Sequence, residues 1–383
     1  MLVLLFMLKV VAGLGYAMFY NLPSYHADSD SFRYFHYSIE ETDMLLKSPL
    51  LFLKDLFSYG YNDIGNVFIG NNSYWNDLKS NIVIKLLAVC NVFSFKNYYI
   101  NIIFFNFFFF FGLIGFFRVM NNIFLHKGLW LLIPIFCIPS FLFWSSGIHR
   151  DGLIFSATGL IIYFFYNSMN DKFTVRNTLF IVALLLLLFA VRNYVCLALI
   201  MSLTAWFVST KTNRALASFI TMYVLAIIVF FLSGNFHSSF NLLAYIANKQ
   251  HEFVQLSGGS EITLPLLQPT ISGFVSYLPA ALDMALLRPH ITELKNLSYL
   301  PAVAETILLF ALLILFFIYR DKKQSIHPAV LACIFLGFSL LLIAGYTVTF
   351  SGAIVRYRSF VLPLIITPLV GMLRFKSLQM VKK

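Results

Sequence analysis

The sequence predicts an all-α protein: a polytopic transmembrane helix bundle with interfacial helices in two long outer loops. Of its 383 residues, 60% are hydrophobic and only 11% are charged, whereas soluble domains carry roughly 25% charged residues. The apolar residues form long runs, close to the about 20 residues that a helix needs to cross a bilayer. These runs lack the alternation of barrel strands. We therefore expect one transmembrane domain over residues 1–383, with about ten spans within a range of about 8–12.

The run over 1–20 is predicted to be an uncleaved first span, because Lys9 lies inside it and no small-residue cleavage site follows. The first outer loop covers about 22–97. Its polar part contains apolar patches and aromatic residues, which predict short helices on the membrane surface. Residues 81–95 are apolar but interrupted by Lys85 and Asn91. This pattern predicts an interfacial or half-buried helix.

The remaining spans follow from the apolar runs. We expect them at about 98–117, 129–146, 152–167, 215–233, 301–319, 328–349 and 359–373. The second outer loop covers about 234–300, and its apolar segment 271–287 can either enter the bilayer or lie on it.

Residues 178–208 contain two apolar runs divided by Arg192 and Asn193. A single straight helix of this length would measure roughly 46 Å. It would also place Arg192 near the bilayer centre, at a cost of about 2.5–3.5 kcal/mol or more. Two short spans joined as a hairpin at Arg192 avoid this cost, so the hairpin is preferred and the single long helix is the alternative.

The distribution of charge predicts the orientation. Cytoplasmic segments are enriched in Lys and Arg, and the most basic turns fall on one side if both termini are cytoplasmic. On the opposite side, acidic residues balance the basic ones, so the whole net charge of +11 lies on the cytoplasmic side. The charge is therefore a topology signal, and nucleic acid is excluded as a partner.

Three polar residues lie side by side where two predicted spans meet on the outer side: His149, Arg150 and Asp151. Ionisable residues at a membrane boundary indicate a functional site. His149 is a candidate acid, base or orienting group, and Asp151 is expected to orient His149 or to pair with Arg150. The alternative is an interfacial turn with one local Arg–Asp pair.

Asp28 and Asp30 lie two residues apart, just beyond the first span. In an extended segment both carboxylates point the same way. Such a pair can bind a divalent cation, or one acid can serve as general base towards an acceptor hydroxyl. No other cofactor is predicted. The alternative is that both are solvated loop acids.

Basic residues recur on the predicted outer side. Arginine binds phosphate through a planar, permanently charged fork and would stabilise a departing phosphate. The alternative is that lipid head groups or local acids hold these arginines. The predicted phosphate-binding or substrate-binding residues are Arg150, Arg192, Arg288, His290, Arg356 and Arg358.

On these features the chain resembles the GT-C class of integral-membrane glycosyltransferases. The resemblance rests on Asp28-Ser29-Asp30 in a long first outer loop, on about ten spans with the N-terminus inside, and on outer-face arginines. Three blocks are also similar to those of membrane proteins of bacterial surface-polysaccharide loci: Trp144–Gly152, Arg288-Pro289 and Arg356-Tyr357-Arg358.

The resemblance implies a polyprenyl-phosphate-linked sugar donor and transfer to a glycan, lipid or protein acceptor on the outer face of a bacterial inner membrane. Asp28 or Asp30 would be the base. One alternative is a Wzy-like polysaccharide polymerase or an O-antigen ligase, which needs outer arginines but no acidic pair. A second is a transporter or flippase of lipid-linked sugar, which would place charged groups along a path through the spans.

Overall fold

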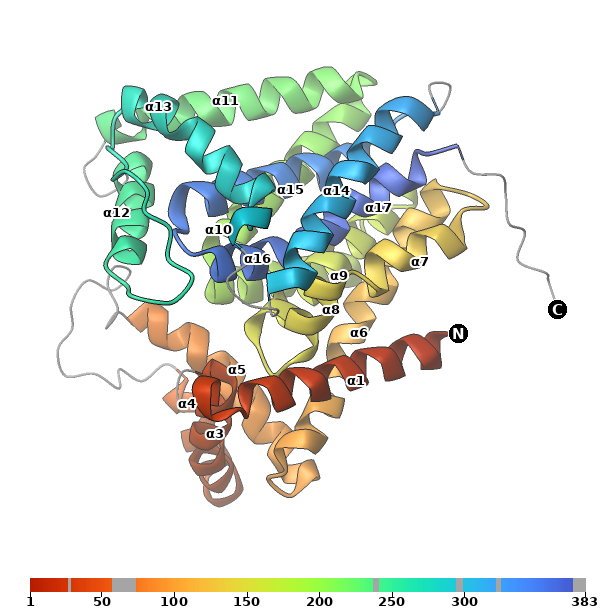
Figure 1. Ribbon diagram of the computed structural model, residues 1–383. Helices are drawn as coiled ribbons and strands as arrows, with labels where there is room; N and C mark the ends of the chain where they lie inside the picture. The colour runs from red at the N-terminus through yellow and green to blue at the C-terminus, as the bar shows by residue number, and fades with distance from the viewer. Residues whose placement is uncertain (27–28, 57–73, 237–240, 294–298, 322–324, 375–383) are drawn as a thin grey trace. The chain divides into compact units, whose positions relative to one another are not determined.

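In the computed structural model the described residues are 1–26, 29–56, 74–236, 241–293, 299–321 and 325–374, and their regular structure is helical throughout (Figure 1). Seven of their helices are long and apolar enough to cross a membrane, or up to nine if each bent pair is one span. The chain is therefore an all-α integral membrane protein. Its described residues form two compact units, residues 1–116 with 142–197 and residues 117–141 with 198–383.

The first unit contains the long first loop and the spans around it. Its helices, or the parts of them that lie in it, are α1 (Leu2–Tyr20), α2 (Pro23–His26), α3 (Asp30–Lys47), α4 (Pro49–Asp55), α5 (Tyr74–Ser94), α6 (Tyr98–Ile123), α8 (Pro139–Ser146), α9 (Arg150–Asn170) and α10 (Val175–Thr212). Helix α6 continues past Arg118, where the sequence predicted its end.

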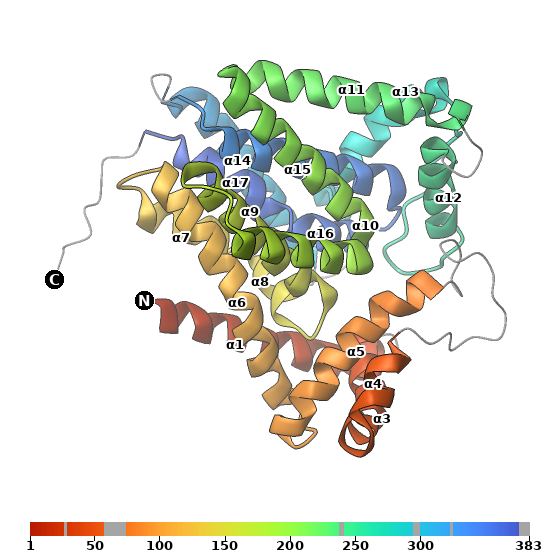
Figure 2. The same cartoon turned by 180° about the vertical axis from the view of Figure 1, so that it is seen from behind.

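The predicted surface helices of the first loop are α2, α3 and α4, and the predicted helix over 81–95 is α5, which is not among the candidate spans. Helices α3 and α5 lie side by side (Figures 1 and 2). Their contact is polar at its centre: the side-chain amide of Asn91 donates to Ser38 Oγ at 2.9 Å and to Thr42 Oγ1 at 3.1 Å. Lys85, which the sequence placed as an interruption, is paired with Glu41 at 2.5 Å and Asp55 at 2.8 Å.

Helices α6 and α9 are in backbone contact. A Cβ added to Gly112 would lie 2.2 Å from Cα of Ser156, and one added to Gly159 would lie 2.4 Å from the carbonyl oxygen of Gly112. Small residues let membrane helices approach this closely. The contact fixes α9 against α6 within the first unit. It thereby helps to position the polar turn that precedes α9.

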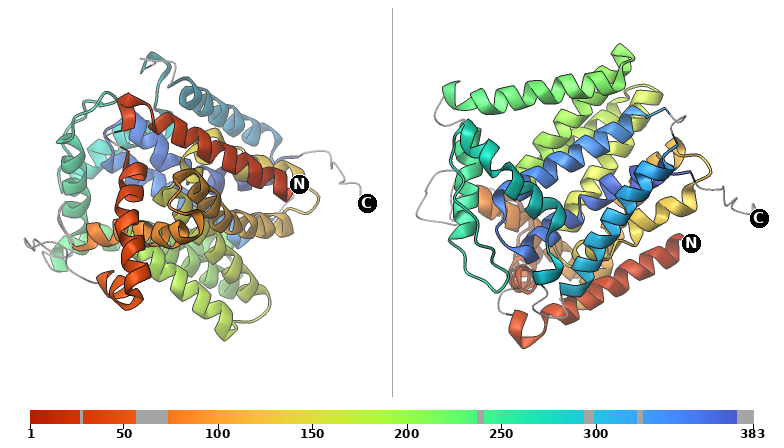
Figure 3. Two further views of the ribbon diagram at one scale, coloured as in Figure 1. Left: turned by 90° about the horizontal axis from the view of Figure 1, so that it is seen from below. Right: turned by 45° about the horizontal axis from the view of Figure 1, so that its top comes forward.

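The second unit contains the second long loop and the last spans. Its further helices are α7 (Gly128–Phe136), α11 (Ala215–Phe236), α12 (Leu242–Val254), α13 (Ile271–Leu282), α14 (Leu300–Tyr319), α15 (Pro328–Thr347), α16 (Ser351–Ser359) and α17 (Leu362–Gly371). Helix α12 packs on α11 and on α15 (Figure 3). The apolar segment 271–287 is α13 followed by a π-helical turn, and it is too short to count as a span.

Two predicted spans are broken helices. The span expected at 129–146 is α7 and α8, bent by 57°. Pro139 opens α8, and proline has no N–H with which to continue the preceding helix. The last span, expected at 359–373, is the pair α16 and α17, bent by 56°. Arg356 and Arg358, expected in a turn before that span, therefore lie in helix α16.

Helix α10 is interrupted at the predicted residue. The backbone of Arg192 leaves the helical region, with φ −149° and ψ 87°. The residues before the break belong to the first unit, and from Ala198 onward the helix belongs to the second. The hairpin itself, and the total of about ten spans, stay predictions.

Candidate functional site

The turn between α8 and α9 is held from several sides within the first unit. Lys9 Nζ, buried within α1, donates to the carbonyl oxygen of Ser145 at 2.8 Å and to the hydroxyls of Ser145 and Ser146 at 2.8 and 3.1 Å. The side-chain amide of Asn106 donates to the carbonyl oxygen of Ser146 at 2.8 Å. Gly147 packs on the ring of Tyr16, where a Cβ would lie 2.4 Å from the ring. These contacts leave the following His149 in one position.

His149 ends this turn and is the N-cap of α9, with an extended backbone (φ −150°, ψ 159°). Two groups of Asp151 approach its Nδ1: the carboxylate Oδ2 at 3.0 Å and the backbone N–H at 3.4 Å. The shorter contact, to a charged oxygen, is the stronger. We therefore assign the proton to Nδ1, which donates it to the Asp151 carboxylate, and Nε2 is left as an acceptor.

Nε2 of His149 faces the carboxylate of Asp30, with 3.6 Å between Nε2 and Oδ2. The side chains of His149 and Asp151 are fully buried, whereas that of Asp30 is 27% exposed. Asp30 is the first residue of α3, where the helix dipole favours a negative charge. Its Oδ1 is paired with Arg33, which is mostly exposed. Asp30 is therefore the end of this network that an external molecule can reach.

Arg192 closes the other end of the network. Its Nη2 donates to Asp151 Oδ1 at 3.0 Å, and its Nη1 donates to the hydroxyl of Tyr194 at 2.9 Å. The interruption of α10 at this residue lets the guanidinium meet the buried carboxylate. An ion pair removes much of the cost of a charge at this depth. Arg192, Asp151 and His149 are bonded in series, and Asp30 faces the remaining ring nitrogen of His149 at 3.6 Å. These four residues are here called the relay.

Arg150 lies beside the relay. Its guanidinium carbon is 5.9 Å from the ring centre of Tyr34, and its Nε is buried without a hydrogen-bond partner. A buried N–H with no partner costs about 1–3 kcal/mol, which an incoming acceptor oxygen would recover. The predicted phosphate-binding role of Arg150 stays a prediction.

The acidic pair cannot be described as a pair, because Asp28 lies outside the described residues. Within the described part of the chain, no group of three or more His, Cys, Asp or Glu side chains is arranged to hold a metal ion. Asp30 and Asp151 lie on opposite sides of the His149 ring rather than around one point. The described geometry therefore supports a proton-handling role for Asp30.

Arg288 and His290 form a separate group in the second unit. Arg288 Nε donates to Asp283 Oδ2 at 2.8 Å, and its Nη1 is paired with Glu293. His290 Nε2 lies 2.9 Å from Asp283 Oδ1. Two carboxylates thus already neutralise Arg288. This arrangement corresponds to the alternative in which local acids hold an arginine.

Arg358 is almost completely buried near this group. Its Nη1 donates to the carbonyl oxygen of Arg288 at 2.9 Å, and its Nη2 donates to Thr306 Oγ1 at 3.0 Å. Its Nε has no hydrogen-bond partner. The neighbouring Glu305 accepts from the backbone N–H and the hydroxyl of Ser140, at 2.9 and 2.7 Å. Arg356 lies two residues before Arg358 on the same helix and is partly exposed.

The predicted site residues therefore fall into two groups. Asp30, His149, Arg150, Asp151 and Arg192 meet in the first unit. Arg288, His290, Arg356 and Arg358 lie in the second. The expectation that all of them share one pocket stays a prediction. Sequence reasoning did not assign roles to Lys9, Tyr194, Asp283, Glu293 or Glu305. Lys9 and Glu305 could have been found as ionisable residues inside apolar spans.

Comparison of the chain with protein-family models, with curated proteins and with solved structures found no match.

Proposed function

We propose that this protein is a membrane glycosyltransferase that moves a sugar from a polyprenyl-phosphate-linked donor to an acceptor hydroxyl, as the resemblance to the GT-C class implies. The observation that carries the proposal is the relay. A carboxylate that an acceptor can reach, Asp30, faces a buried imidazole, which a second carboxylate orients. General bases in enzymes are commonly supported in this way.

In the proposed reaction, Asp30 accepts the proton of the acceptor hydroxyl as its oxygen attacks the anomeric carbon. The bond between the acceptor oxygen and this carbon forms while the bond to the lipid phosphate oxygen breaks. The bonding electron pair leaves with the phosphate. Nε2 of His149 then receives a hydrogen bond from the protonated Asp30. The protonated Asp30 and His149 are together neutral, and Asp151, which Arg192 holds in place, keeps the imidazole oriented.

The leaving phosphate needs a cation with free donors. In the first unit Arg150 meets this need best, because its Nε has no partner while Arg192 is engaged with Asp151. We assign Arg150 the phosphate-binding role, and Arg192 the role of positioning the relay.

The proposal includes an orientation. With both termini in the cytoplasm of a bacterial cell and about ten spans across the inner membrane, the relay lies at the outer face. Support comes from the basic turns on the cytoplasmic side. The break at Arg192 also supports it, because it allows residues 175–212 to form two short spans.

The test uses Asp30→Asn, with Asp43→Asn as the matched control on the same helix. Asp43 is exposed and accepts a hydrogen bond from Lys96 Nζ at 2.7 Å. This bond lowers the pKa of the Asp43 carboxyl. The control substitution therefore also removes a negative charge from α3. The purified protein is incubated with a panel of polyprenyl-phosphate and polyprenyl-diphosphate sugars, and the glycosylated product is measured.

We expect Asp30→Asn to lower kcat by about 10²–10⁴-fold, as for the loss of a general base, and Asp43→Asn to leave it unchanged. Equal activity of the two variants would overturn the proposal. Asp28→Asn is measured in parallel, because the resemblance implies that either acid can be the base.

A polysaccharide polymerase or O-antigen ligase is the second candidate. It is favoured by the pair in the second long loop in which the Asp283 carboxylate lies 2.9 Å from Nε2 of His290. Such an enzyme would retain activity in the double variant Asp28→Asn, Asp30→Asn and lose it in His290→Ala. Movement of lipid-linked sugar across vesicles without any covalent change would instead support a transporter.

A further inference from the structure

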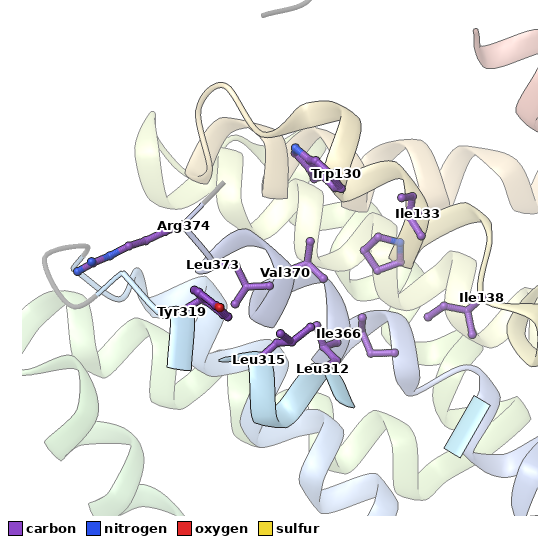
Figure 4. Close-up of a pocket in the computed structure, with 11 residues that line it drawn as sticks. Trp130, Ile133, Ile138, Leu312, Leu315, Tyr319, Ile366, Val370, Leu373 and Arg374 are labelled. Carbon is purple, nitrogen blue, oxygen red and sulfur yellow. The ribbon is translucent and has the colours of Figure 1, made fainter. Parts of the chain in front are cut away.

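An apolar groove opens in the second unit between α7, α14 and α17 (Figure 4). Its volume is about 510 Å³, within the range of ligand pockets. Each helix contributes apolar side chains to its walls: Trp130, Ile133, Leu312, Leu315, Ile366 and Val370. Several of these side chains, including Ile133 and Leu315, are exposed in the protein alone. In a membrane, the groove would therefore be in contact with lipid.

The groove has one polar end. Tyr319 and Arg374 line it there, and Figure 4 shows Arg374 at the edge of the apolar side chains. This is where α14 ends and where the chain leaves α17, and Trp130 lies near the start of α7. Tryptophan and tyrosine near helix ends are typical of the membrane–water interface. The polar end therefore lies at the level of the lipid head groups.

The polar end is prepared for an anion. Arg374 is 59% exposed and forms a long ion pair with Asp321, 3.8 Å between Nε and Oδ1, which is beyond hydrogen-bond distance and leaves its donors available to a second anion. Lys127 Nζ donates to the carbonyl oxygens of Gly371 and Leu373 at 2.7 and 2.9 Å. Lys127 thus covers the negative end of the α17 dipole, which would otherwise repel a phosphate.

The length of the groove indicates which class of lipid chain it can hold. Leu312 and Tyr319 both line it from α14, and the seven helical residues from one to the other rise roughly 10 Å. One leaflet of the hydrocarbon core is about 15 Å deep. The groove therefore matches an acyl chain confined to one leaflet better than a long polyprenyl chain.

We propose that this groove binds an anionic glycerophospholipid, with an acyl chain along α7, α14 and α17 and the phosphate on Arg374. The inference is independent of the proposed function. Every residue that it uses lies in the second unit, whereas the relay and Arg150 lie in the first. On the predicted orientation the bound lipid belongs to the cytoplasmic leaflet.

The test measures lipid binding to the delipidated full-length protein by native mass spectrometry. Phosphatidylglycerol and phosphatidylcholine with identical chains are compared. Wild type should bind one phosphatidylglycerol about tenfold more tightly than phosphatidylcholine, because both present a phosphate to Arg374 but only phosphatidylcholine places a second cation, its quaternary ammonium, beside the arginine. Arg374→Gln should abolish this preference, whereas Arg214→Gln, an exposed arginine before α11, should keep it.

A second variant tests the groove itself. Val370→Trp should fill it and weaken both lipids by about tenfold or more, while Ile318→Trp, on the exposed face of α14, should weaken neither. The proposal is overturned if wild type does not prefer phosphatidylglycerol, or if Arg374→Gln and Val370→Trp bind as wild type does. It is also overturned if undecaprenyl phosphate displaces phosphatidylglycerol at equal concentration.

Discussion

Replacing Asp151 by Asn tests whether the relay is the stabilising centre of the first unit. Asp151 is completely buried and accepts from Arg192 at 3.0 Å through one oxygen, while His149 lies 3.0 Å from the other. Asparagine keeps the shape but removes the negative charge. The guanidinium of Arg192, only 9% exposed, would then be a buried charge without its counterion.

Removing one partner of a buried ion pair costs about 3–5 kcal/mol. The lost contact with His149 is part of the same network, so its contribution is not added separately. For a unit of this size, 1 kcal/mol shifts Tm by about 2–4 °C, so we expect a decrease in Tm on the order of 10 °C. The matched control is Asp171→Asn, an exposed acid at the other end of α9, which should change Tm by about 1 °C or less.

The measurement is thermal unfolding in detergent for Asp151→Asn, Arg192→Met and the double variant. Replacing both charges by uncharged groups avoids the unpaired ion. The double variant should therefore be more stable than Asp151→Asn alone. If the losses of the two single variants simply add up in the double variant, the two residues are not coupled and the relay is not the ion-paired network inferred here.

Three further predictions concern single positions. His149→Asn places a favoured N-cap residue at the start of α9, so it should change Tm less than Asp151→Asn does but lower kcat about 10²-fold; unchanged transfer would remove the imidazole from the mechanism. Gly112→Ala should cost about 1–3 kcal/mol, because its Cβ would lie 2.2 Å from Cα of Ser156, whereas Gly15→Ala meets nothing within 4 Å and should be neutral or slightly stabilising; equal unfolding temperatures would refute the backbone contact. His327 caps α15, and burial lowers its pKa from 6.5. Its contribution to stability is therefore complete above about pH 6.5 and is lost as the pH falls towards the lower folded-state pKa. A curve of Tm against pH should show this loss in the wild type and not in His327→Asn.

Some parts of the candidate site could be inferred from neighbouring residues alone. The break at Arg192 follows from the cost of an arginine at the centre of a long apolar helix. The polar turn at His149 follows from its position between two apolar runs. By contrast, the bends between α7 and α8 and between α16 and α17 were not predicted. Residues 129–146 form an apolar run long enough to read as one continuous span, and the polar residues of α16 read as a turn before the last span.

The partners of the predicted residues could not be inferred in the same way. Arg288 was predicted to bind phosphate, yet two carboxylates close to it in sequence neutralise it. Arg192 was predicted to bind phosphate as well, and the structure shows it paired with Asp151. An arginine that binds phosphate and an arginine that pairs with a carboxylate of the protein look the same in the sequence. Only the position of the nearest carboxylate in the folded chain distinguishes the two roles.

The sequence by itself determined that the chain is an all-α membrane protein and approximately where its apolar helices lie, because the transfer of a segment from water to lipid depends on the composition of that segment alone. Only the tertiary structure decided that Asp30 faces His149, that Lys9 holds the turn before it, and that the predicted phosphate-binding arginines fall into two units. These contacts join residues far apart in the chain, and they depend on how helices pack, which local hydropathy does not encode.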